Sequence, residues 1–153
     1  MPTIGVISDT HGLLRAEAVQ ALRGTDLILH AGDIGGTAIL EELRRLAPLF
    51  AVRGNVDRGL WAEDLPDREF VSFGGTSIYL LHDRAHLDLD PAAAGLAAVV
   101  FGHSHQPAQE IREGVLYFNP GSAGPRRFKL PVCVGRLHLA GGKLSGEVIT
   151  LLA

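Results

Sequence analysis

Apolar segments of this 153-residue chain repeatedly end in a polar turn that carries aspartate, asparagine or histidine. Residues 3–7, for example, are rich in β-branched side chains and lead directly into Ser8-Asp9-Thr10-His11-Gly12. This pattern predicts a buried strand that stops at a glycine-containing turn. Six stretches have this character: Asp9-x-His11, Gly32-Asp33, Gly54-Asn55, His82 after residues 79–81, Gly102-His103-x-His105, and Asn119-Pro-Gly-Ser122. The fold must therefore end several buried strands in polar turns.

The first third of the chain predicts strands that alternate with helices. We expect strands at residues 3–7, 26–30 and 48–52, and helices at residues 17–23 and 38–46. Thr37 is expected to cap the second helix. This order implies parallel strands joined by right-handed crossovers. The carboxyl ends of such strands meet at one edge of the sheet, so Asp9, Asp33 and Asn55 are expected to lie together.

The rest of the chain predicts mainly hairpins. Paired strand segments at residues 70–73 and 77–81, 108–112 and 115–119, and 132–139 and 144–151 each flank a turn that contains glycine. Residues 97–101 form a further apolar segment, which ends in Gly102. We expect two sheets, one whose strands are joined largely by crossover connections and another whose strands are joined largely by hairpins. The sequence contains no repeat or linker, so residues 1–153 are expected to form one domain.

The side chains in these turns are typical of a metal site with oxygen and nitrogen ligands. Side chains alternate along a strand, so Asp9 and His11 are expected on the same side, and so are His103 and His105. Seven candidate ligands are too many for one tetrahedral ion but fit two ions that share a carboxylate: Asp9, His11, Asp33, Asn55, His82, His103 and His105. Two metals about 3.5–4 Å apart suit an in-line displacement at phosphorus.

Composition and charge exclude several other functions. The formal net charge is −3, so no basic surface for nucleic acid is expected. The longest uncharged apolar stretch, residues 91–102, is too short to span a membrane. The N-terminal segment lacks the basic start of a secretory signal. Cys133 is the single cysteine and can form no internal disulfide, so a cytoplasmic location is expected.

The ordered motifs resemble those of the calcineurin-like metallophosphoesterase superfamily. The segments SDTHG, HAGD, VRGN-x-D, GHSH and NPGS resemble the small bacterial and archaeal phosphodiesterase branch, and together they cover residues 4–123. The resemblance implies an α/β (α+β) fold, a four-layer αββα sandwich of two mixed β-sheets flanked by helices. It also implies that the active site lies at the strand ends.

The resemblance also implies roles for single residues. Asp9, His11 and His105 would bind one metal, Asn55, His82 and His103 would bind the other, and Asp33 would bridge them. The cofactors would be two divalent transition-metal ions, with Mn²⁺ expected first and Ni²⁺, Fe, Zn²⁺ or Co²⁺ as alternatives. The expected reaction is hydrolysis of a small phosphodiester by a metal-bridging hydroxide, with Asp33, Asn55 and His103 as catalytic residues.

Two positions depart from the family pattern. Val56 stands where many phosphomonoesterases have a histidine that protonates the leaving group, so diesters with good leaving groups are favoured. Asp83 follows a predicted metal ligand where the branch usually has glycine. Its carboxylate is expected mainly to repel an anionic substrate, and the alternatives are that it donates a proton or orients a ligand histidine. Arg53, Asn55, Asp83 and His86 are the candidate substrate contacts.

Other interpretations remain open at this point. Asp9 and Asp33 could cap helices, Asn55 could be a turn residue, and His86 could lie in a solvated loop. His30 could support the site or be purely structural. The alternative functions are a phosphomonoesterase or protein phosphatase, and a non-catalytic protein-interaction module, as in a retromer subunit of this fold. The expected partner is a small phosphoester, with a homo-oligomer possible.

Overall fold

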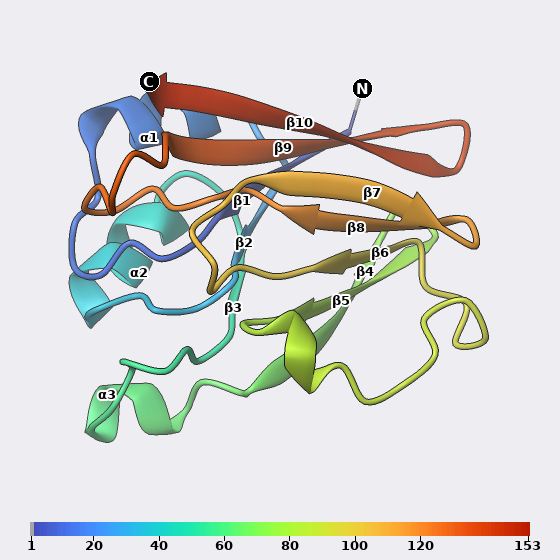
Figure 1. Cartoon of the computed structure of the whole chain (residues 1–153), viewed down its shortest axis with the longest axis horizontal. Helices are drawn as coiled ribbons and strands as arrows, with labels where there is room; N and C mark the ends of the chain where they lie inside the picture. Colours follow the sequence, from blue (N-terminus) through green and yellow to red (C-terminus); the bar gives the residue numbers. More distant parts are fainter. Residues whose placement is uncertain (1) are drawn as a thin grey trace.

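The computed structural model describes residues 2–153, whose strands form two five-stranded β-sheets (Figure 1). The first sheet has the order β10-β9-β1-β2-β3. Its strands are β1 (Thr3–Ile7), β2 (Leu27–His30), β3 (Leu49–Ala51), β9 (Val132–Ala140) and β10 (Lys143–Leu152). β1, β2 and β3 are parallel and are joined through α1 (Ala16–Leu22) and α2 (Thr37–Arg44). The parallel strands and connecting helices predicted for the first third of the chain are therefore confirmed.

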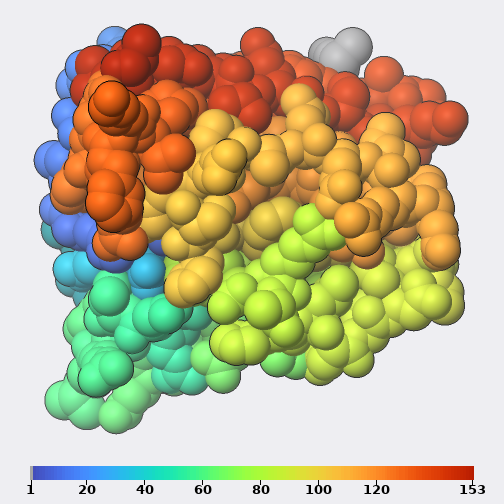
Figure 2. Space-filling view, in the orientation of Figure 1, coloured from blue at the N-terminus to red at the C-terminus, as the bar shows by residue number. Residues whose placement is uncertain are grey.

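The second sheet has the order β4-β5-β6-β8-β7. Its strands are β4 (Arg68–Phe73), β5 (Thr76–Leu81), β6 (Ala98–Val100), β7 (Ala108–Arg112) and β8 (Val115–Asn119). The hairpins β4–β5 and β7–β8 are antiparallel, whereas β5, β6 and β8 run parallel to one another. In the space-filling view, the yellow-green loop that follows β5 and the yellow to orange segments that include β7 lie on the face toward the viewer, and the red C-terminal strands line the upper edge (Figure 2).

The division into a crossover sheet and a hairpin sheet was wrong in one respect. The β9–β10 hairpin joins the first sheet, where β9 pairs antiparallel with β1 and places Leu137 beside Ile4. The first sheet is consequently mixed, and the second is mixed because its parallel strands β5, β6 and β8 adjoin antiparallel hairpins. The free edge of β1 accepts β9, and one face of the hairpin then lies toward the second sheet, where Leu137 and Leu144 are buried. Val134 on the other face packs in the cluster that the helices cover.

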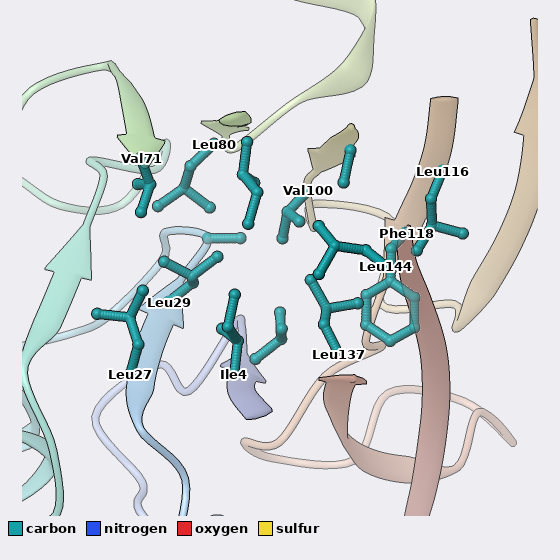
Figure 3. Packing of buried hydrophobic residues seen from close by; sticks show 14 of the residues in the cluster. Ile4, Leu27, Leu29, Val71, Leu80, Val100, Leu116, Phe118, Leu137 and Leu144 are labelled. Carbon is teal, nitrogen blue, oxygen red and sulfur yellow. The ribbon is translucent and has the colours of Figure 1, made fainter. Parts of the chain in front are cut away.

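The main core lies between the two sheets (Figure 3). Ile4 and Leu29 from the first sheet point toward Leu80 and Val100 from the second. Phe118 of β8 reaches across to β9, where a Cβ atom on Gly135 would lie only 2.4 Å from its ring. Glycine in β9 therefore makes the space that the largest core side chain of β8 fills.

Helices α1 and α2 cover the outer face of the first sheet. Leu22 of α1 and Leu43 of α2 are buried against Ile7 and Ile28 of the sheet. The predicted cap at Thr37 was wrong, because Thr37 is the first helical residue and Gly36 precedes it as N-cap without a side-chain hydrogen bond. A third, short helix, α3 (Leu60–Glu63), follows β3.

The outer face of the second sheet is covered by a loop in place of the expected helices. The loop begins with a 3-10 turn, η1 (Arg84–His86), and then buries Leu96 against Tyr79 and Val99. The two mixed sheets of the expected sandwich are confirmed, and its fourth layer is irregular. None of the helices in residues 2–153 has the length and apolarity needed to cross a bilayer.

Candidate metal centre

The polar turns after strands of both sheets meet at one edge of the molecule. The backbone N–H of Asp9 donates to the Gly32 carbonyl at 3.0 Å, which joins the turns after β1 and β2. The Gly102 N–H donates to the His82 carbonyl at 2.9 Å, which joins the turns after β5 and β6. The Asp9 side chain connects the two sheets, because its Oδ2 accepts from the His103 N–H at 3.1 Å.

Most of the predicted ligands have an unusual backbone conformation. Seven residues other than glycine have positive φ in residues 2–153, and five of them are predicted metal ligands: Asp9 (55°), His11 (46°), Asp33 (56°), His103 (71°) and His105 (63°). The left-handed region is unfavourable for side chains other than glycine. Such strain is typical of functional sites, where the surrounding contacts hold it in place.

Asp9, His11 and His105 form one cluster of potential ligand atoms. Asp9 Oδ2 accepts hydrogen bonds from the Ser8 hydroxyl and the His103 N–H. Asp9 Oδ1 is buried and has no hydrogen-bond partner among residues 2–153, although it lies 3.5 Å from His105 Nε2 and 3.9 Å from His11 Nε2. His11 Nε2 is also buried without a partner in this part of the chain. A cation would satisfy these converging atoms.

The Asp33 carboxylate lies between this cluster and a second one. Its Oδ1 accepts from the Val56 N–H at 3.0 Å. Its Oδ2 is 3.6 Å from His11 Nε2 and 3.3 Å from His82 Nε2. One oxygen of Asp33 therefore faces ligand atoms of both predicted metal sites, as the predicted bridging role requires. Asp9 also reaches the second site, because its Oδ1 lies 4.0 Å from His82 Nε2 and Asp9, Asp33 and His82 form the second cluster of potential ligand atoms.

His82 and His103 supply the nitrogen atoms of the second cluster. His82 Nδ1 is 2.7 Å from the Ala31 carbonyl, which can only accept, so Nδ1 carries the proton and Nε2 presents its lone pair toward Asp33. His103 Nδ1 lies 3.3 Å from His82 Nε2. Asn55 is exposed and lines the same pocket as His82.

The two carboxylates differ in their electrostatic surroundings. Burial raises the pKa of Asp9 above its ordinary value. Burial acts in the same direction on Asp33, but the adjacent His82 ring and the Val56 N–H hold the pKa of Asp33 below its ordinary value. Burial, aided by the positive charge of Arg127, lowers the pKa of His105 to about 4, so this imidazole is neutral at pH 7 and free to bind a metal.

Two residues that the sequence analysis did not assign as ligands hold the turns in place. The Asp57 carboxylate accepts from the N–H groups of Ile34, Gly35 and Gly54 at 2.9–3.0 Å, so it ties the turn after β2 to the turn after β3. Sequence reasoning missed this role, and the only signal was the spacing Gly-Asn-x-Asp. Asn119 donates to the Gly102 carbonyl at 3.0 Å and so supports the turn of His103 and His105.

His30 links the turns after β1 and β2. Its Nδ1 accepts from the Gly32 N–H at 3.1 Å, so Nε2 carries the proton and donates to the Thr10 hydroxyl at 3.0 Å. Thr10 in turn donates to the Ile34 carbonyl. Full burial lowers the pKa of His30 to about 3. His30 is thus a neutral cross-link between the ligand-bearing turns.

A pocket of about 440 Å³ opens beside the second cluster. All four predicted substrate contacts line it: Arg53, Asn55, Asp83 and His86. Arg53 is fixed by Asp67, whose Oδ1 accepts from its Nε and Nη2 at 3.1 and 3.0 Å. Arg58 also lines the pocket and was missed in the sequence, where nothing distinguishes it from other surface arginines.

Comparison with known families gives one clear match. A family model described as the calcineurin-like phosphoesterase superfamily domain matches residues 3–142. A probable metallophosphoesterase of Methanothermobacter thermautotrophicus is 39% identical over 95% of this chain and 91% of its own length. A phosphodiesterase of Methanocaldococcus jannaschii is 27% identical over 77% of this chain and 82% of its own length.

Solved structures show the same fold. Vacuolar Protein Sorting 29 of Cryptosporidium parvum superposes with a TM-score of 0.77 over 99% of this chain and 98% of that chain, at 18% sequence identity. At this identity, the similarity establishes the architecture of the two sheets and carries no conclusion about activity.

Proposed function

The chain belongs to the calcineurin-like phosphoesterase superfamily, a family of metal-dependent phosphoric ester hydrolases, and from this premise we propose that it is a dinuclear phosphodiesterase. The observation that carries the proposal is the position of Asp33 Oδ2, which lies within 3.6 Å of His11 Nε2 and within 3.3 Å of His82 Nε2. A carboxylate oxygen placed between two sets of ligand atoms suits two ions better than one.

The residues present fit two divalent transition-metal ions. Asp9, His11 and His105 would hold one ion, and Asn55, His82 and His103 the other, with Asp33 shared. The unpartnered Asp9 Oδ1 and His11 Nε2 support the first site, and the lone pair that His82 Nε2 directs toward Asp33 supports the second. Carboxylate, amide and imidazole ligands without thiolate suit Mn²⁺ first, and Fe, Ni²⁺, Co²⁺ or Zn²⁺ as alternatives. When bound, such ions lower the pKa of a water molecule and neutralise charge on phosphoryl oxygens.

The chain's own residues would bind and orient the substrate. Arg53 is held rigidly by Asp67 at the wall of the pocket, where its guanidinium can bind an anionic phosphoryl oxygen. Asn55 and His86 line the same pocket. Val56 has no proton to give to a leaving group, which favours diesters whose leaving groups need no protonation.

We further propose that the substrate is a small phosphoester and that the enzyme works in the cytoplasm, where the free, buried Cys133 stays reduced.

The proposal is tested by paired assays on protein purified without chelator. Elemental analysis should give two metal ions per chain, and the Mn²⁺-loaded protein should hydrolyse bis(p-nitrophenyl) phosphate faster than p-nitrophenyl phosphate. The Asp33→Asn variant should lose both properties. Preference for the monoester would instead support a phosphomonoesterase. Protein that binds no metal when offered Mn²⁺ would contradict the proposal and support a non-catalytic interaction module.

A further inference from the structure

Asp83 contacts the site through a side chain that makes two different interactions. Its Oδ1 accepts from the Ala85 N–H at 3.0 Å and so caps η1. Its Oδ2 lies 3.7 Å from His103 Nε2. The cap fixes the direction of the carboxylate, and the side chain is only 24% exposed. Asp83 therefore holds a negative charge beside one nitrogen of the His103 ring.

The other nitrogen of this ring faces the metal cluster. His103 Nδ1 lies 3.3 Å from His82 Nε2, and the two rings are nearly perpendicular at 81°. A neutral imidazole carries its proton on one nitrogen only, so His103 binds a metal through Nδ1 only when the proton is on Nε2. His82 Nε2, which accepts, would favour the opposite tautomer by drawing the proton to His103 Nδ1.

We infer that Asp83 is a positioning residue that holds the proton of His103 on Nε2 and thereby presents Nδ1 to the metal. Asp83 Oδ2 lies 3.7 Å from Nε2, which is longer than a direct hydrogen bond, and His82 Nε2 lies 3.3 Å from Nδ1. The full negative charge of a carboxylate attracts an N–H group more strongly than a neutral imidazole nitrogen does, and on this ground Asp83 outweighs His82 in setting the tautomer. The inference rests on the proposed function for the role of His103 as a ligand. It replaces repulsion of the substrate as the main effect expected of Asp83, because the carboxylate is turned toward His103.

The expected consequence is tighter metal binding. A carboxylate that accepts from the second nitrogen of a ligand histidine fixes the ring and its tautomer, and loss of such a partner typically weakens metal affinity by about 10–100-fold. Asp83→Asn is the informative variant, since its amide oxygen retains the cap on Ala85 while the charge is lost. Asp90→Asn is the matched control, because Asp90 also caps a turn in the same loop through the Ala93 N–H.

The first measurement needs no metal. Nitrogen-15 NMR of the histidine rings at pH 8, in chelated protein, should show Nδ1 of His103 unprotonated in the wild type and in Asp90→Asn. In Asp83→Asn the ring should shift toward the Nδ1–H tautomer. A His103 tautomer that is the same in Asp83→Asn and the wild type would overturn the inference, whatever the metal content of the protein.

The second measurement is chelator competition with Mn²⁺. Asp83→Asn should bind the ion proposed to be held by Asn55, His82 and His103 about 10–100-fold less tightly than Asp90→Asn does, with unchanged circular dichroism. Unchanged Mn²⁺ affinity together with a lower KM for a diester would overturn the inference and support repulsion of the substrate. A wild type that binds no metal would instead defeat the proposed function, and the tautomer measurement would still decide the contact between Asp83 and His103.

Discussion

Val56 is the residue whose side chain we expect to decide which ester the pocket favours. It follows Asn55 directly, its backbone N–H donates to Asp33 Oδ1, and its side chain is 49% exposed. A histidine at this position would lie beside the candidate metal centre and could protonate a poor leaving group. We expect Val56→His to raise activity on p-nitrophenyl phosphate relative to its diester by at least about tenfold, since general acid catalysis typically contributes about 10²–10⁴-fold.

The comparison variant is Val56→Gln, which adds polarity and length but no group that titrates near pH 7. It should leave the ratio of the two activities close to that of the wild type. If Val56→Gln raises the ratio of monoester to diester activity as much as Val56→His does, proton donation does not explain the change. The preference would then come from the shape of the pocket.

A second residue-scale prediction concerns His30 and pH. The pKa of His30 is about 3 in the folded protein and 6.5 when unperturbed. Between these values the unfolded chain binds a proton that the folded protein does not, so the contribution of His30 to stability is present above pH 6.5 and is lost as the pH falls. The expected loss is about 1.4 kcal/mol per pH unit.

Urea unfolding of chelated protein at pH 7, 6, 5 and 4 measures this effect. As the pH is lowered, the free energy of unfolding should decrease more steeply in the wild type than in His30→Gln, whose side chain does not titrate. His138→Gln is the control, because His138 is partly exposed beside Glu147. Equal slopes in the wild type and His30→Gln would show that burial of His30 does not drive the pH dependence.

At the scale of elements, local patterns predicted strand ends well because each apolar run stops where a polar turn begins. β7 (Ala108–Arg112) and β8 (Val115–Asn119) begin and end at the predicted residues. The place of the β9–β10 hairpin was not predictable in this way, since pairing with β1 joins segments more than a hundred residues apart. Most candidate ligands were found because their types and spacing are unusual, whereas the cross-links made by Asp57 and His30 depend on the folded turns.

The turn after β6 provides an element-scale prediction. Gly102 has no positive φ, but a Cβ atom there would lie 2.1 Å from Ser8 Oγ and 2.7 Å from Asp9 Oδ2. We expect Gly102→Ala to displace the Asp9 carboxylate, to lower the free energy of unfolding by about 1–3 kcal/mol and to reduce the metal content.

Gly95→Ala is the control that separates the steric clash of a Cβ at Gly102 with Ser8 and Asp9 from the general cost of replacing a glycine by alanine. Gly95 has φ +75°, and apart from Gly95 itself and its two chain neighbours no atom of the described residues lies within 4 Å of the position that a Cβ would occupy. The substitution therefore introduces backbone strain of about 1–2 kcal/mol without touching the site. Gly95→Ala should keep its full metal content. Retention of two ions by Gly102→Ala would show that the contact between Gly102 and Asp9 does not position the ligand.

At the scale of the whole molecule, the candidate metal centre joins the two sheets. Asp9, His11 and Asp33 follow strands of the first sheet, whereas His82, His103 and His105 follow strands of the second. The core residues between the sheets hold them together through apolar contacts, and the ligands meet at the edge of that interface. Metal ions bound there would connect the sheets directly, so metal binding and global stability should be coupled.

The coupling predicts a rise in the free energy of unfolding on addition of Mn²⁺. A ligand that binds only the folded state at a hundred times its dissociation constant adds about 2.7 kcal/mol, and the gain grows with its concentration. The urea midpoint of the wild type should therefore increase with Mn²⁺ concentration and fall on chelation. Asp33→Asn should lose this dependence, because Asp33 is the proposed shared ligand, whereas Asp90→Asn should keep it. If Mn²⁺ raises the midpoint of Asp33→Asn as much as that of the wild type, the ions bind elsewhere and do not join the sheets.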